Sequence, residues 1–243
     1  MLHNKYAIGT VIGAALLGLA KSSLLGSKND GVTVNSMEEL LRHANDPKLA
    51  PLVTEVDLDG NQLTNLPSEI GNLTNLKSLD LSFNQLKTIP PEIWNLKNLE
   101  DLFLIENHLT TLPPEIGKLK NLKSLSLIEN ELTTLPPEIG NLKNLKSLSL
   151  NNNLLTTLPP EISNLNNLDI LHLSDNQLKT IPPEIGKLTK LEWLSLYRNP
   201  NLKITLNFVV DLLNTYQNTD VATILSPYIH QQTIPARQTI RMR

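Results

Sequence analysis

The chain contains no cysteine among its 243 residues. Disulfide bonds, thiolate zinc sites and cysteine nucleophiles are therefore excluded. A bacterial lipid anchor, which is attached to an N-terminal cysteine, is excluded for the same reason. The absence does not fix the compartment, because many exported bacterial proteins also lack cysteine.

Aromatic residues and basic charge are scarce as well. Phe, Trp and Tyr together make up only 4% of the residues, so leucine must build the core. The formal net charge is −3, and 40% of the residues are hydrophobic, which is typical of a folded protein. Without a basic excess we expect no nucleic-acid partner.

Long hydrophobic runs are missing except near the start, where residues 7–20 read "AIGTVIGAALLGLA" after Lys5. A membrane-spanning helix needs about 20 apolar residues, so this run favours a signal peptide, with Gly18 and Ala20 at cleavage spacing. Two alternatives stay open: a membrane anchor that extends over residues 7–25 and contacts the membrane, or a buried helix. The expected localisation is thus exported or membrane-anchored, with a cytoplasmic location as the alternative.

What the sequence does contain is a repeat. Residues 109–130, "LTTLPPEIGKLKNLKSLSLIEN", return almost unchanged as residues 132–153, "LTTLPPEIGNLKNLKSLSLNNN". A fixed period of 23 residues indicates a solenoid, in which each unit buries its apolar face against the next.

Each repeat combines a strand with a return turn. Leu125 and Leu127 alternate with serines, which is the periodicity of a strand, and strands that recur after a wide turn must be parallel. The double proline of "LPPEIG" fixes φ and cannot donate to a ladder, which predicts an extended segment or a short turn. A full α-helix does not fit in the remaining residues.

Asparagine is the polar exception in this apolar frame. Its amide donates and accepts at once, so a stacked column can satisfy backbone groups where the strands end. We predict a structural asparagine ladder made of Asn61, Asn84, Asn107, Asn130, Asn153, Asn176 and Asn199.

The pattern L-x-x-L-x-L-x-x-N-x-L-x-x-L-P-x-x-I-x-x-L, over about residues 53–202, closely resembles the leucine-rich-repeat family. It is similar to bacterial proteins with 23-residue repeats and to Ras-group and scribble-type intracellular scaffolds. The resemblance implies a right-handed horseshoe, an α/β repeat solenoid with a concave parallel sheet and an irregular, polyproline-II or 3-10 convex side. It also implies binding of a protein partner. Ser68, Trp94 and Ser163 depart from the frame.

Four segments follow from these patterns. Residues 1–30 form the signal peptide or membrane anchor with a linker. Residues 31–52 form an N-terminal helical cap, where Ser36 and Glu39 make a capping box. Residues 53–203 form the solenoid with seven strand units, and residues 204–243 form a C-terminal helical cap and tail.

Function is expected where the frame allows variation, on the concave face between the strand leucines. Its N-terminal part is an acidic patch made of Glu55, Asp57, Asp59, Asp80 and Asp101. The centre and the C-terminal end carry apolar, aromatic and charged residues of the types that dominate binding surfaces. The predicted partner-binding residues are Phe83, Phe103, Ile105, Glu106, Ile128, Glu129, Ile170, His172, Trp193, Tyr197 and Arg198.

Catalysis is not expected. His172 lies one strand from Ser149 and Ser195, but no third orienting group is evident, and carboxylates on an open sheet lack a cleft that excludes water. We predict no cofactor and no metal site, although weak calcium binding at the acidic end stays open in the absence of EF-hand spacing. The prediction is a non-catalytic module that binds a protein partner in adhesion, host interaction or scaffolding. The alternative is a structural, self-associating envelope protein.

Overall fold

A computed structural model describes residues 31–203 of the chain. The chain divides into two compact units, Met1–Gly31 and Val32–Arg243, and all described residues except Gly31 belong to the second unit. The N-terminal segment and the C-terminal cap that the sequence predicts lie outside the described residues and stay predictions. Within residues 31–203, no helix combines the length and the hydrophobicity needed to cross a bilayer.

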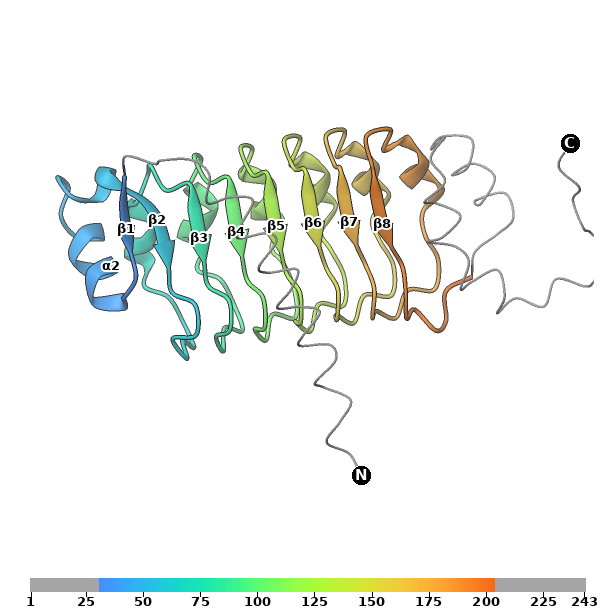
Figure 1. The fold of residues 1–243 in the computed structure, drawn as a ribbon, viewed down its shortest axis with the longest axis horizontal. Coiled ribbons are helices and arrows are strands. Elements are labelled where there is room, and N and C mark those ends of the chain that lie inside the picture. The colour runs from blue at the N-terminus through green and yellow to red at the C-terminus, as the bar shows by residue number, and fades with distance from the viewer. Residues whose placement is uncertain (1–30, 204–243) are drawn as a thin grey trace, which may run out of the picture. The chain divides into compact units, whose positions relative to one another are not determined.

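Eight parallel strands form one sheet in chain order (Figure 1). Equivalent residues of consecutive repeats pair directly, for example Leu102 with Leu125, so the period of the sequence is the register of the sheet. This confirms the predicted repeat solenoid. The strands are β1 (Val32–Val34), β2 (Val53–Asp57), β3 (Ser78–Asp80), β4 (Asp101–Phe103), β5 (Ser124–Ser126), β6 (Ser147–Ser149), β7 (Ile170–His172) and β8 (Trp193–Ser195).

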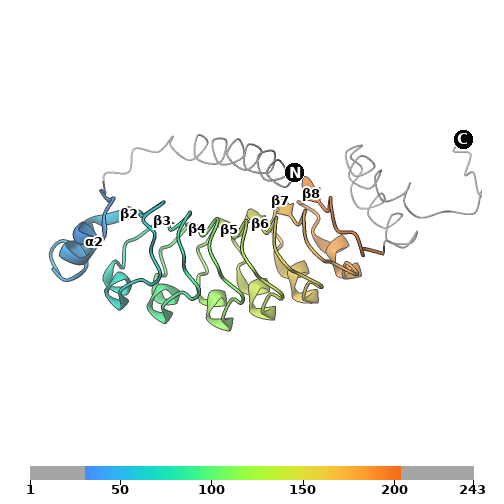
Figure 2. The same ribbon diagram turned by 90° about the horizontal axis from the view of Figure 1, so that it is seen from below.

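Short 3-10 helices return the chain from one strand to the next. They begin at or directly after the prolines, because proline has the φ of a helix start and lacks only an N–H that would be unpaired there. Figure 2 shows these helices along one side of the row and the strands along the other, with the row bent toward the strands. The helices are η2 (Ser68–Asn72), η3 (Pro91–Asn95), η4 (Pro114–Lys118), η5 (Pro137–Asn141), η6 (Pro160–Asn164) and η7 (Pro183–Lys187).

The core is a continuous column of leucine and isoleucine between the sheet and the 3-10 helices. In β5 and the residue that follows it, Leu125 and Leu127 are buried, and Ile116 of η4 and Leu122 pack into the same core. Each buried leucine contributes about 1.5–3 kcal/mol through removal of its surface from water. Because that surface is covered by neighbouring repeats, stacking holds each repeat in place.

The N-terminal end is closed by helix α2 (Met37–Ala44). Ser36 caps the helix, since its hydroxyl accepts a hydrogen bond from the Glu39 backbone N–H at 3.2 Å. Leu40 is fully buried against the first repeats, and η1 (Ala50–Leu52) leads into β2. The same segment also contributes β1, which the sequence analysis did not predict because three residues are too few to show a clear alternation.

The 3-10 helices of adjacent repeats touch closely where glycine occupies their fourth position. A Cβ atom on Gly117 would lie 2.8 Å from the carbonyl oxygen of Glu138 in the next repeat. Trp94 and Ser163 replace this glycine in two repeats. Trp94 is buried, and the Ser163 hydroxyl donates to the Pro160 carbonyl at 2.8 Å.

Candidate binding surface

Six buried asparagines lie where the strands pass into the return segments. The Asn130 amide donates to the Leu104 carbonyl at 2.8 Å, and its oxygen accepts from the Leu109 N–H at 3.0 Å. Both partners belong to the preceding repeat, so each side chain ties two repeats together. The same two contacts recur at Asn84, Asn107, Asn153, Asn176 and Asn199.

Asn61 does not belong to this column, so the predicted ladder was one residue too long. Its side chain is exposed, and its amide donates to the Asp59 carbonyl in its own turn at 3.0 Å. Asn84 takes the first place in the column, with the Leu58 carbonyl as acceptor. The first turn also follows a different backbone path, because both Gly60 and Gln62 have positive φ.

A left-handed residue precedes each asparagine of the column. These residues have φ between 49° and 55°, a region that non-glycine residues seldom adopt. They turn the chain out of the strand and place a row of side chains along the rim of the strand face. The row consists of Phe83, Glu106, Glu129, Asn152, Asp175 and Arg198.

The acidic residues gather on β2, β3 and β4. Register pairs Asp57 with Asp80, and Glu55 with Ser78, which in turn pairs with Asp101. Burial raises the pKa of Asp101 above its usual value, against the lowering effect of a hydrogen bond from Ser124. The predicted acidic residues thus lie on neighbouring strands, although Asp80 itself is buried.

The rim beside this patch is acidic as well. Burial raises the pKa of Glu106, and the carboxylates of Glu129 and Asp59 raise it further. Asn152 donates to the Glu129 carboxylate at 3.5 Å. Glu106 and Glu129 are half-buried, so their carboxylates still reach the solvent at the edge of the strand face.

The apolar centre is less accessible than predicted. Phe83 and Phe103 are half-buried, but Ile105 is only 4% exposed and Ile128 only 9% exposed. The expectation that these two isoleucines are exposed was wrong. Ile105 and Ile128 occupy equivalent positions of consecutive repeats, where side chains lie close enough to touch.

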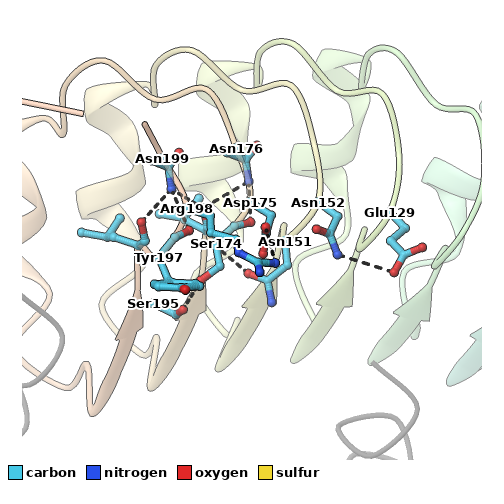
Figure 3. Close-up of polar contacts among 12 residues, drawn as sticks. Glu129, Asn151, Asn152, Ser174, Asp175, Asn176, Ser195, Tyr197, Arg198 and Asn199 are labelled. Carbon is cyan, nitrogen blue, oxygen red and sulfur yellow. Dashed lines mark hydrogen bonds and ion pairs between the residues drawn. The ribbon is translucent and has the colours of Figure 1, made fainter. Parts of the chain in front are cut away.

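The C-terminal end presents the most exposed aromatic residues of the described surface. Trp193 is 56% exposed and Tyr197 is 54% exposed, and Ile170 pairs with Trp193 on the neighbouring strand. The Arg198 guanidinium lies 5.3 Å from the centre of the Tyr197 ring and donates to Asp175 at 3.4 Å (Figure 3). We call Ile170, Trp193, Tyr197 and Arg198 the aromatic end.

His172 lies beside the aromatic end on β7. Its Nδ1 is 3.4 Å from the Ser149 hydroxyl, and burial lowers the pKa of the imidazole, which favours the neutral ring. Within residues 31–203, no carboxylate is hydrogen-bonded to this ring, so no oriented triad forms. The contacts of Ser174 with Asn151 and with Ser195 fix the neighbouring surface (Figure 3).

A second asparagine column runs along the return segments, and the sequence analysis missed it. Asn121 donates to the Lys97 carbonyl at 2.9 Å in the preceding repeat. The equivalent bond is made by Asn75, Asn98, Asn144 and Asn167. Its sequence signal was present, since these asparagines also recur with the repeat period.

Comparisons with known proteins agree with this geometry. The family profile described as "Leucine-rich repeat region" matches residues 56–131 and 114–217. No curated protein matches the chain. Among solved structures, a leucine-rich-repeat protein of Leptospira interrogans is 31% identical with a TM-score of 0.48, over 76% of this chain and 63% of that one.

Two further solved structures match over a smaller part of this chain. The PEPR1–AtPEP1 structure is 34% identical with a TM-score of 0.55, over 63% of this chain and 23% of that one. The ectodomain of the Arabidopsis receptor kinase HAESA, in complex with an IDA peptide hormone, is 35% identical with a TM-score of 0.56, over 62% and 27%. The chain spans less than two thirds of each of these three structures.

Proposed function

Because the chain belongs to the leucine-rich-repeat family, we propose that it is a non-catalytic module whose strand face binds a protein or peptide partner. The observation that carries the proposal is the exposure of Trp193 and Tyr197 on that face. Large aromatic side chains that remain in water represent apolar surface that a partner can cover.

The aromatic end has the composition of a binding hot spot. Tryptophan, tyrosine and arginine are enriched among the few residues that supply most of the binding energy in protein interfaces. Arg198 is already held over Tyr197 and against Asp175, so little of its freedom is lost when a partner arrives. The site is therefore partly pre-organised.

The structural neighbours support a peptide or protein as the ligand class. The receptor kinase HAESA is seen with a peptide hormone, and it shares the fold at 35% identity. That match covers only part of the receptor, so its ligand is not carried over to this chain. The acidic patch lies at the other end of the strand face from the aromatic end. It favours a partner whose contacting residues there are basic, and such a partner associates faster at low salt.

The cellular setting rests on the N-terminal segment. We propose export or membrane anchoring through residues 7–25, which suits adhesion or host interaction. N-terminal sequencing of the protein from fractionated cells tests this, since a chain that retains Met1 in the soluble interior would contradict it.

Affinity selection tests the binding proposal. A random-peptide display library is selected on the full chain, and enriched peptides are measured on Trp193→Ser/Tyr197→Ser. We expect at least tenfold weaker binding, because removal of two aromatic anchors costs more than 1.4 kcal/mol. The matched control is Leu154→Ser, which removes a leucine that is 40% exposed and lies outside the aromatic end.

The outcomes separate the competing functions. Peptides that bind the double variant as well as the wild type would contradict a ligand site at the aromatic end. Concentration-dependent dimers in analytical ultracentrifugation, lost in the double variant without any selected peptide, would favour the self-associating structural protein instead.

A further inference from the structure

We propose that the edge of the solenoid at which the strands begin binds the surface of a membrane that contains anionic phospholipids. Lys123 and Lys146 directly precede β5 and β6, and Lys120 and Lys143 lie three residues before them, in the turn that follows the 3-10 helix. We call the whole group the lysine edge. It consists of Lys97, Lys118, Lys120, Lys123, Lys143 and Lys146, all of which are exposed.

The repeat geometry holds these lysines in rows. The Lys146 N–H donates to the Lys123 carbonyl at 2.8 Å, so the row next to the strands advances by one repeat at each step. The second asparagine column ties the other row together, since Asn121, beside Lys120, donates to the Lys97 carbonyl at 2.9 Å. Neighbouring strands are about 4.8 Å apart and the Debye length is about 10 Å in 0.1 M salt, so charges of consecutive repeats act together.

The positive charge of the lysine edge is largely uncompensated. Among residues 31–203, one carboxylate forms an ion pair with it: Glu100, whose Oε2 lies 2.5 Å from Lys123 Nζ. Lys143 donates to the Asn164 carbonyl at 2.9 Å, and Lys120 makes the equivalent bond at 3.4 Å. A neutral carbonyl positions an ammonium group without cancelling its charge. The edge is therefore locally positive on a chain whose formal net charge is −3.

This positive charge is concentrated in the repeats of β4 to β6. Beyond β6 the same edge has mixed charge, because Asp169 and Glu192 precede β7 and β8 while Lys187 and Lys190 lie in the last turn. In the repeats of β4 to β6, the glutamates of the 3-10 helices stand at the start of each helix, whereas the lysines lie at its end or after it. Carboxylates and ammonium groups are thus separated in space there.

The composition of the lysine edge favours lipid head groups over nucleic acid. A lysine ammonium is a hydrated point charge on a flexible stem, so it is attracted to mobile head groups without a fixed geometry. Readout of nucleic acid uses arginine forks or exposed aromatic side chains that stack on bases. Residues 97–100, 118–123 and 141–146 contain neither. Their leucines are buried in the core, so we expect contact with the membrane surface without insertion.

Cosedimentation of the full chain with vesicles tests the lysine edge. One set of vesicles contains equal parts of phosphatidylglycerol and phosphatidylcholine, and the other contains phosphatidylcholine alone. Apolar attraction through residues 7–20 acts on both sets, so the measured quantity is the ratio of the two partition constants. We expect a ratio above about tenfold in about 0.1 M salt that falls toward one in about 1 M salt, where the Debye length is only about 3 Å.

The variant Lys97→Gln/Lys118→Gln/Lys146→Gln removes half of the lysine edge. It leaves intact the three lysines whose side chains are bonded to neighbouring residues. Each lysine near an anionic surface contributes about fivefold in affinity, so the ratio should fall by at least about tenfold.

The matched control is Lys87→Gln/Lys179→Gln/Lys203→Gln. These exposed lysines follow the asparagine column at the other edge, and their loss changes the net charge by the same amount. The control should keep the ratio within about twofold of the wild type, because these charges lie away from the lysine edge.

Each outcome decides the proposal. Circular dichroism and urea unfolding establish first that both variants are folded. A wild-type ratio near one, or an equal loss in both variants, would overturn the lysine edge as a membrane-binding surface. Tighter binding to single-stranded RNA than to the anionic vesicles, lost in the edge variant, would overturn the assignment to lipid.

Discussion

At the scale of single residues, the buried asparagines couple one repeat to the next. Asn130 satisfies a carbonyl of one segment and an N–H of another, both in the preceding repeat. Neither backbone group has a ladder partner of its own where the strand ends. The side chain thus replaces backbone hydrogen bonds that the turn cannot make.

Substitution of Asn130 measures this role. We expect Asn130→Ala to lower the free energy of unfolding by about 1–3 kcal/mol, because it leaves buried backbone groups without partners. The control is Asn61→Ala, which should change it by less than about 0.5 kcal/mol since Asn61 is exposed. Urea denaturation of both variants makes the comparison, and equal losses would contradict the assignment of Asn61 outside the column.

The sequence predicted the positions of the buried asparagines, but it did not predict that Asn61 lies outside their column. Periodicity locates a residue in a column, yet it carries no information on where the column begins. The first turn differs because Gln62 has positive φ, and no local sequence pattern predicted this conformation. Burial of Ile105 and Ile128 was equally invisible, since exposure depends on side chains from neighbouring strands.

At the scale of elements, glycine sets how closely the 3-10 helices of adjacent repeats approach. Three glycines, at positions 71, 117 and 140, lie against the glutamate of the following repeat. Trp94 stands at the same place in η3 and is buried, so one repeat accommodates a large side chain there. The sequence showed this substitution but not which direction its side chain takes.

Gly117→Ala tests the close approach. The added methyl would meet the Glu138 carbonyl oxygen at 2.8 Å, and such overpacking costs about 1–3 kcal/mol. Helix propensity alone would stabilise alanine over glycine by about 0.5–1 kcal/mol, so the sign of the change decides between the two effects. We expect Gly117→Ala to lower the urea midpoint. A higher midpoint would show that the backbone around Gly117 and Glu138 can move apart at little energetic cost.

At the scale of the whole molecule, the strand face divides along its length. The acidic residues lie on β2 to β4 and in the turn after β2, while the exposed aromatic residues lie on β8 and directly after it. A peptide that follows the face would meet carboxylates at one end and aromatic rings at the other. The fold itself was predictable because leucine, asparagine and proline repeat with one period, whereas side-chain exposure on this face was not.

Removal of one complete repeat tests whether the solenoid is modular. Deletion of residues 110–132 joins Leu109 to Thr133, and β4 then pairs with β6 in unchanged register, because positions 109 and 132 are equivalent. We expect a folded chain whose unfolding free energy is lower by about 1–3 kcal/mol, from a typical stability per residue.

Deletion of residues 110–121 alone is the control. It removes η4 and leaves too short a connection for β5 to pair in parallel with β4, so it should abolish cooperative unfolding. Cooperative unfolding of this shorter deletion, at the same urea midpoint as the complete-repeat deletion, would contradict the nearest-neighbour coupling expected of repeat proteins.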